Sequence, residues 1–150
     1  MVNCMKKQIM VPFFRTAKIR QITLKRKLDE LCLSGLMHTV LHKVGEMGTC
    51  TQEQIISESL ADKGAISRDC ARLEELGLIT RQNDPENKRR KLLSLTEEGR
   101  RIRQELVELD ERTAEVLLSG FSAEEKAQFV SYLERMEKNA EALIRENTGI

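Results

Sequence analysis

The stretch from residue 59 to residue 96 constrains the fold more than any other part of the chain. Its first half predicts a helix over residues 62–76, because Asp62 offers a carboxylate as N-cap and Gly77 stands where a left-handed C-cap belongs. The apolar residues of this helix recur at spacings of four and three and form one buried stripe: Ile66, Cys70 and Leu73. Its other faces carry small residues and arginines, a composition that suits the major groove of DNA.

Two strand patterns separated by a charged turn follow this helix. Residues 78–80 begin the first strand and residues 92–95 form the second. Between them, residues 83–87 (NDPEN) favour a turn and residues 88–91 (KRRK) are a run of cations. A basic hairpin beside a basic helix predicts a winged helix-turn-helix. The alternative for the cationic run is a charged hairpin that faces only solvent.

Four motifs in this order resemble the MarR family of bacterial transcription regulators. They are residues 62–68 (DKGAISR), 72–81 (RLEELGLITR), 84–90 (DPENKRR) and 95–100 (LTEEGR). One position differs: the family's wing usually carries Asp-x-Arg, whereas this chain has Asn87 in the acidic position and keeps Arg89 in the basic one. An amide cannot form the ion pair that a carboxylate could, but it can form a hydrogen bond.

The flanking segments predict long helices with more apolar surface than one chain can cover. The first helix is expected over residues 11–31, with Pro12 in its first turn. It carries two apolar lines, one made of Ala17, Leu24, Leu28 and Leu31 and the other of Ile19 and Ile22. A helix with two apolar lines must be covered on two sides, which an interlocked dimer achieves easily.

Further helices are expected where a capping residue precedes an apolar repeat. Ser34 caps a helix over residues 35–46, Thr51 one over 52–60, Thr96 a long one, and Ser122 the last; residues 48–50 form a short extended link. The last two helices share a four-three spacing: Ile102, Leu106, Leu109, Thr113 and Val116, then Phe129, Leu133, Met136, Ala140 and Leu143. Such seams are typical of helix packing, here in the core and at a dimer interface.

The charge distribution is uneven although the net charge is only +1. Residues 1–27 carry many lysines and arginines and no acid, whereas acids outnumber bases between residues 105 and 146. The basic first helix and the acidic last helices are complementary, which favours packing between them; two separate solvated faces are the alternative.

No apolar run is long enough for a membrane span or an export signal. The four cysteines lack Cys-x-x-Cys spacing, so we expect reduced thiols in a cytoplasmic protein. Cys70 belongs to the buried stripe and is expected to be a core residue, while a thiol switch at Cys4 or Cys32 is an alternative.

The sequence does not predict an enzyme or a cofactor. Both histidines, His38 and His42, lie one turn apart on one expected helix, so most hydrolytic schemes lack a base. This pair could chelate a metal ion, with Cys32 or Glu46 nearby, but a convincing site needs three or four ligands. Two ordinary surface or pocket-lining histidines are the simpler interpretation.

The predicted DNA contacts come from three elements. Ser67 and Arg68 are placed to read base edges, and arginine to guanine is the commonest specific contact. By resemblance, Arg89 at the wing tip reaches the minor groove. The complete set is Gln52, Lys63, Gly64, Ala65, Ser67, Arg68, Arg72, Lys88, Arg89 and Arg90.

We therefore expect a mainly α, winged-helix (α+β) fold in which residues 34–96 bind DNA and residues 1–33 with 97–150 form the dimerisation region. The expected function is that of a homodimeric transcriptional regulator, a repressor, on a pseudo-palindromic operator in double-stranded DNA. The resemblance implies that small-molecule effectors bind between the dimerisation helices and the DNA-binding lobe. The alternatives are a metal- or redox-responsive regulator of the same fold and a winged-helix protein-interaction module without DNA specificity.

Overall fold

The computed structural model describes the backbone of residues 2–59, 61–87 and 89–148, and side chains between residues 6 and 142 of these ranges. Three residues named above, Cys4, Lys88 and Leu143, therefore fall outside the described residues or side chains, as does residue 60 at the end of the helix expected over 52–60. The chain forms two compact units, one up to residue 111 and the other from residue 112. Among the described residues, no helix is both long enough and apolar enough to cross a membrane.

Three helices of the first unit begin at the predicted caps. They are α2 (Gly35–Met47), α3 (Gln52–Glu58) and α4 (Lys63–Glu75). Ser34 and Thr51 accept hydrogen bonds from the amides of Met37 and Gln54, and Asp62 Oδ1 accepts one from the Ala65 amide at 2.9 Å. Each cap satisfies one amide that has no partner inside its helix, so short polar side chains fix where these helices start.

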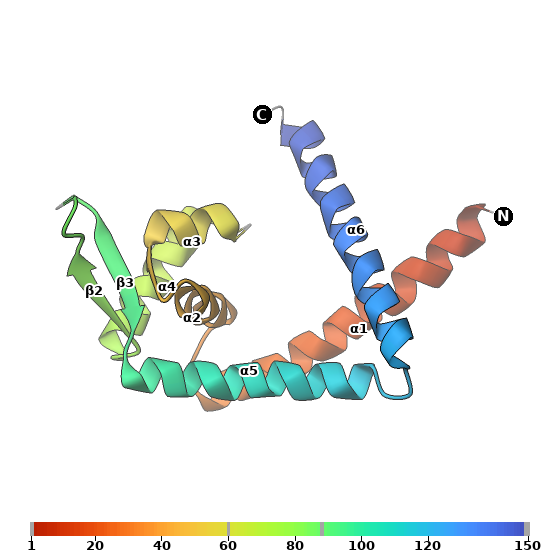
Figure 1. Cartoon of the computed structure of the whole chain (residues 1–150), viewed down its shortest axis with the longest axis horizontal. Helices are drawn as coiled ribbons and strands as arrows, with labels where there is room; N and C mark the ends of the chain where they lie inside the picture. Colours follow the sequence, from red (N-terminus) through yellow and green to blue (C-terminus); the bar gives the residue numbers. More distant parts are fainter. Residues whose placement is uncertain (1, 60, 88, 149–150) are drawn as a thin grey trace. The chain divides into compact units, whose positions relative to one another are not determined.

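A three-stranded antiparallel sheet completes the winged lobe (Figure 1). Its strands are β1 (Thr49–Thr51), β2 (Ile79–Asn83) and β3 (Lys91–Leu95), in the order β1-β3-β2. Of the extended link predicted at residues 48–50, Thr49 and Cys50 thus belong to a strand, in which Cys50 pairs with Leu93, whereas Gly48 is the C-cap of α2. β2 and β3 form the predicted hairpin, in which Arg81 pairs with Leu93 and Asn83 with Lys91.

The core lies where α2 and α4 pack against the sheet. The stripe predicted on α4 is fully buried, so the prediction for Cys70 is confirmed. Four apolar residues of α2 are buried too: Met37, Val40, Leu41 and Val44. Among the described residues, the large side chains that are fully buried are Val40, Leu41, Val44, Cys50, Ile55, Ile66, Cys70, Leu73, Ile79, Leu93 and Leu106.

The base of the wing is joined to α5 (Glu97–Leu117) by backbone contacts. Thr96 caps α5 as predicted, because its hydroxyl accepts from the Gly99 amide at 2.9 Å; the same hydroxyl donates to the Gly77 carbonyl at 2.7 Å. Gly77 has φ of +70°, the left-handed conformation expected after α4. A Cβ on Gly99 would lie 1.9 Å from the Leu78 carbonyl oxygen, so only glycine allows this close approach.

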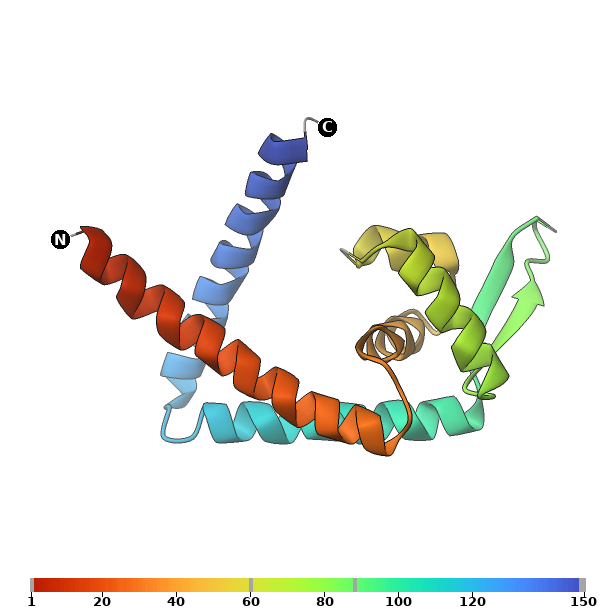
Figure 2. The ribbon, with the colours of Figure 1, turned by 180° about the vertical axis from the view of Figure 1, so that it is seen from behind.

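Helix α1 (Val2–Glu30) begins earlier than predicted. The predicted start at Val11 is wrong, because Pro12 lies inside the helix rather than in its first turn. Proline removes one intrahelical hydrogen bond, and the solvent exposure of this segment lets water take the place of the missing donor. Two ion pairs join α1 to α5 within the first unit, Arg20 to Asp110 at 2.7 Å and Lys27 to Glu105 at 2.7 Å, as the complementary charges predicted; Figure 2 shows the two helices side by side here.

The second unit contains α6 (Ala123–Thr148). Gly120, with φ of +84°, lies in the turn before it, and the Ser122 hydroxyl caps it by accepting from the Glu125 amide at 3.2 Å. Three residues of its predicted seam, Phe129, Leu133 and Met136, are exposed in the single chain. Val130 and Tyr132, which lie outside the seam, are exposed too.

Candidate nucleic-acid interface

The face of α4 that points away from the core carries the predicted base-reading residues. Ser67 and Arg68 are exposed, while Gly64 and Ala65 are half-buried. Arg68 folds back along the helix, since its Nη1 lies 3.5 Å from the place where a Cβ on Gly64 would stand. Because Gly64 and Ala65 have small side chains or none, the start of α4 leaves room for the guanidinium of Arg68.

Two arginines near the end of α4 are paired with carboxylates. Arg72 Nη1 lies 2.9 Å from a Glu75 oxygen, and Arg81 Nε of β2 lies 3.2 Å from a Glu74 oxygen. Exposed pairs of this kind contribute little to stability, so they orient the two guanidinium groups without fixing them. Arg72 remains exposed and able to reach a phosphate.

The turn of the wing is ordered by its own backbone. The Asp84 amide donates to the Arg90 carbonyl at 3.1 Å, and the Arg90 amide donates to the Asn87 carbonyl at 2.8 Å. Asn87 Oδ1 accepts from the backbone amide of Arg89 at 3.1 Å. The residue in the acidic position therefore holds the backbone of the turn, while the side chain of Arg89 is exposed.

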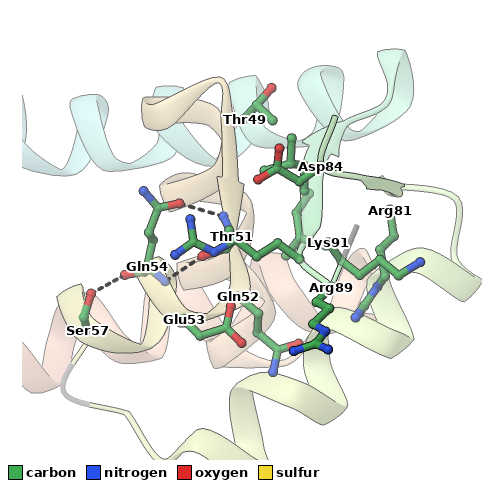
Figure 3. Close-up of a pocket in the computed structure, with 13 residues that line it drawn as sticks. Thr49, Thr51, Gln52, Glu53, Gln54, Ser57, Arg81, Asp84, Arg89 and Lys91 are labelled. Carbon is green, nitrogen blue, oxygen red and sulfur yellow. Dashed lines mark hydrogen bonds between the residues drawn. The ribbon is translucent and has the colours of Figure 1, made fainter. Parts of the chain in front are cut away.

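A hollow of about 860 Å³ separates the wing from the start of α3 (Figure 3). Figure 3 shows Gln52 from α3 and Arg89 from the wing reaching toward the same part of it, so the structure brings two predicted contacts together. Arg90 also lines the hollow. The other lining residues were not predicted as contacts, and they include Thr49, Arg81 and Lys91. Only the pairing register of β2 and β3, which sequence patterns do not give, shows that Arg81 and Lys91 share a face.

Both histidines lie on α2, where His38 contacts α5 and His42 pairs within α2. Their rings stack with centroids 6.2 Å apart. His38 Nε2 lies 3.5 Å from Asp110, and His42 Nε2 lies 3.2 Å from Glu46. Burial lowers the pKa of His38, although Asp110 acts in the opposite direction. Within the described residues, no cluster of three or more His, Cys, Asp or Glu side chains has the geometry of a metal site.

The described cysteines differ in exposure. Burial raises the pKa of the Cys70 thiol to about 11 and also raises the pKa of Cys50, so both are poor nucleophiles at neutral pH. Cys32 is exposed and has φ of +56°, at the corner between α1 and α2.

Comparisons with known proteins agree with this geometry. The family model "MarR family" matches residues 33–91. The HTH-type transcriptional regulator YybA of Bacillus subtilis, itself uncharacterised, is 32% identical over 115 residues, which cover 77% of this chain and 77% of the relative. The chain belongs to the MarR family. The regulator HosA of Escherichia coli is 27% identical over 104 residues, covering 69% of this chain and 77% of the relative.

Solved structures extend the match beyond the winged lobe. A MarR-family regulator from Listeria monocytogenes, solved with a 26-mer DNA, superposes with a TM-score of 0.82 at 25% identity, covering 94% of this chain and 95% of that chain. The transcriptional regulator SlyA superposes with a TM-score of 0.76 at 32% identity, covering 88% and 93%. The mainly helical winged-helix fold is thus confirmed, and the protein is a DNA-binding transcriptional regulator rather than an enzyme.

Proposed function

We propose that this MarR-family protein is a cytoplasmic repressor that binds a pseudo-palindromic operator as a homodimer and is released by a small-molecule effector. Two features of the chain together support the proposal: a cationic wing and an arginine-bearing helix adjoin in the winged lobe, while α1 and α6 leave large apolar side chains exposed. The first feature suits duplex DNA, and the second suits pairing of two copies.

Each predicted contact among the described residues has a role that its position supports, and Lys88 keeps the role that the sequence predicts. Ser67 and Arg68 read base edges in the major groove, and Gly64 and Ala65 allow the close approach of α4. Arg89 enters the minor groove, with Arg90 and Lys88 on the flanking phosphates. The remaining phosphate contacts come from Gln52, Lys63 and Arg72.

Dimerisation supplies the affinity and spacing that one lobe lacks. Exposed apolar residues on α1 (Ile19, Ile22) and α6 (Leu133, Met136) would be buried between copies. Two recognition helices related by a two-fold axis fit half-sites about one turn of DNA, roughly 34 Å, apart.

The corner between α1 and α2 supports release by an effector. A second hollow of about 330 Å³ lies there, with Leu24, Leu28 and Leu33 in its wall beside Ser34. The Ser34 hydroxyl donates to Asp69 of α4 at 2.9 Å, so a ligand that moves this corner would act on the recognition helix. Titration calorimetry with small aromatic acids and Zn²⁺, together with operator release, tests this step; heats no larger than those of nonspecific binding would contradict it.

A gel shift with the DNA upstream of the protein's own coding region tests the function. We expect a specific complex that resists competitor DNA. Arg68→Ala should weaken the specific complex by about 1–3 kcal/mol and relax its specificity, whereas Lys88→Ala should weaken binding to all DNA about equally. A stable monomer that ignores duplex DNA at low salt would contradict the proposal.

A further inference from the structure

The pairing of β2 with β3 gives the wing two different faces. Ile79 pairs with Leu95 and Arg81 with Leu93, and Asn83 pairs with Lys91 at the outer end. Because side chains alternate along a strand, these six residues share one face of the hairpin. Ile79, Leu93 and Leu95 are buried against the helices, so Arg81 and Lys91 continue the helix-covered face outward, toward the wing tip.

Two contacts hold these cations in place without neutralising both. Arg81 has a side chain 27% exposed and pairs with Glu74 of α4, which directs it into the angle between the wing and the recognition helix. Lys91 Nζ donates to Asn83 Oδ1 at 2.5 Å. That partner is a neutral amide, so the ammonium keeps its full charge and two further N–H donors.

The hollow beside them is cationic. In the described part of its wall, four cations (Arg81, Arg89, Arg90 and Lys91) face two carboxylates (Glu53 and Asp84). In Figure 3 the labelled cations come from the hairpin side, and Gln52 comes from the α3 side. Amide and hydroxyl donors opposite ordered cations suit an anion with several acceptor oxygens.

We propose that Lys91 and Arg81 form a phosphate-binding pair on the inner face of the wing, which holds the DNA strand that crosses from the major groove under α4 to the minor groove under the wing. The inference rests on the proposed DNA binding and names contacts within it. A backbone phosphodiester is the ligand, because the strand that separates two adjacent grooves must pass between the two elements that enter them. Lys91 is the stronger phosphate contact, and Arg81, which is partly neutralised by Glu74, is the weaker one beside it.

The salt dependence of binding is the first test. Lys91→Gln removes the charge but keeps a side chain of similar length. In the dimer it should weaken operator and nonspecific DNA alike, roughly tenfold or more. It should also reduce the slope of log K against log salt by about 0.9 for each protomer. Lys25→Gln is the matched control, since Lys25 is 75% exposed on α1 and pairs with Asp29; its slope should equal that of the wild type. Lys91→Arg should restore the slope.

A methylphosphonate scan of the operator locates the contact. Neutralising the phosphate that Lys91 holds should weaken wild-type binding about as much as Lys91→Gln does. Combining the two changes should add little, because each removes the same contact. Arg81→Gln should couple to the same phosphate more weakly, and thermal unfolding of every variant checks that the wing is intact.

The outcomes distinguish a failure of the phosphate-binding pair from a failure of the proposed regulatory function. Normal operator binding by Lys91→Gln with an unchanged slope, or additive effects at every phosphate, would overturn the phosphate-binding pair while leaving the regulator intact. An absence of operator binding by the wild type would overturn the proposed function itself. Inorganic phosphate at millimolar concentration should not displace the operator; displacement that Lys91→Gln abolishes would mean that the hollow binds free phosphate rather than DNA.

Discussion

The winged lobe (α2 to β3, residues 35–95) and the terminal helices (α1 and α6) carry similar helical repeats but bury them differently. In the lobe, Leu41, Ile66 and Leu73 are completely buried within one chain. On α6, the seam residues Phe129 and Met136 are each 41% exposed. The same periodicity therefore stabilises the lobe within one protomer and leaves the terminal helices with surface to bury.

This difference indicates that the lobe is stabilised within one chain, whereas the terminal helices need a partner. A lobe with a complete core can keep its DNA-binding surface rigid without help from another chain. Helices with exposed seams depend on a partner, so their stability should depend on protein concentration. Substitutions that act on one region and not on the other can test this comparison.

The largest effect is expected from a charge in the α6 seam. Leu133→Asp should dissociate the proposed dimer, because a carboxylate replaces an apolar contact in both protomers. With roughly 1.5–3 kcal/mol for each buried leucine, counted twice, the free energy of dimerisation should fall by about 3–6 kcal/mol. Sedimentation equilibrium measures the dissociation constant, which should rise roughly 10²–10⁴-fold.

Ser131→Asp is the control for this substitution. Residue 131 is exposed and lies on the side of α6 opposite to Phe129, so the same charge should leave the dimer unchanged. Equal dissociation by both variants would mean that general charge repulsion, and not the seam, sets the assembly.

Substitutions in the core of the lobe should lower the folding stability of the single chain rather than dissociate the dimer. Leu41→Ala removes a fully buried side chain and should lower the free energy of unfolding by about 2–5 kcal/mol. Leu76→Ala, at the C-cap of α4, truncates a side chain that is 36% exposed and should cause a clearly smaller loss. Urea denaturation at several protein concentrations measures both, and similar losses would contradict the contrast in burial.

The sequence predicted those parts of the fold that depend on local chemistry. Ser34, Thr51 and Asp62 mark helix starts because a short polar side chain satisfies a free amide, whatever the rest of the chain does. The stripe of α4 follows from helical spacing alone. A three-residue strand such as β1 has too few residues for any alternation, so only its pairing with β3 shows that it is a strand.

Features that depend on distant partners could not be predicted in this way. Pro12 suggested a helix start by a local rule, but the exposed α1 continues through it. Lys91 and Arg81 are ten positions apart, and only the register of the hairpin places them on one face. The bond between Ser34 and Asp69 likewise joins elements whose approach no local pattern specifies.

A smaller loss of stability is expected where the wing meets α5. Gly99→Ala would place a Cβ 1.9 Å from the Leu78 carbonyl oxygen, which is backbone and cannot move aside easily. Overpacking of this kind should destabilise the lobe by about 1–3 kcal/mol. Gly35→Ala is the matched control, because nothing lies within 4 Å of its Cβ and alanine favours the helix. Thermal unfolding should separate the two variants. Equal melting temperatures would mean that the backbone at Leu78 can shift to make room for the added Cβ.

The smallest effect concerns pH and the joint between the lobe and α5. Burial lowers the pKa of His38, so the folded state binds fewer protons than the unfolded state as pH falls through the ordinary range of histidine. Stability should therefore fall below about pH 6.5 and stop falling once the pH is under the folded-state pKa. His38→Gln should lose this decline, whereas His42→Gln, which removes the more exposed imidazole of the pair, should keep it. Denaturation curves between pH 8 and pH 5 measure the difference. A gain in stability on acidification would show that the attraction of Asp110 for the charged imidazole outweighs burial.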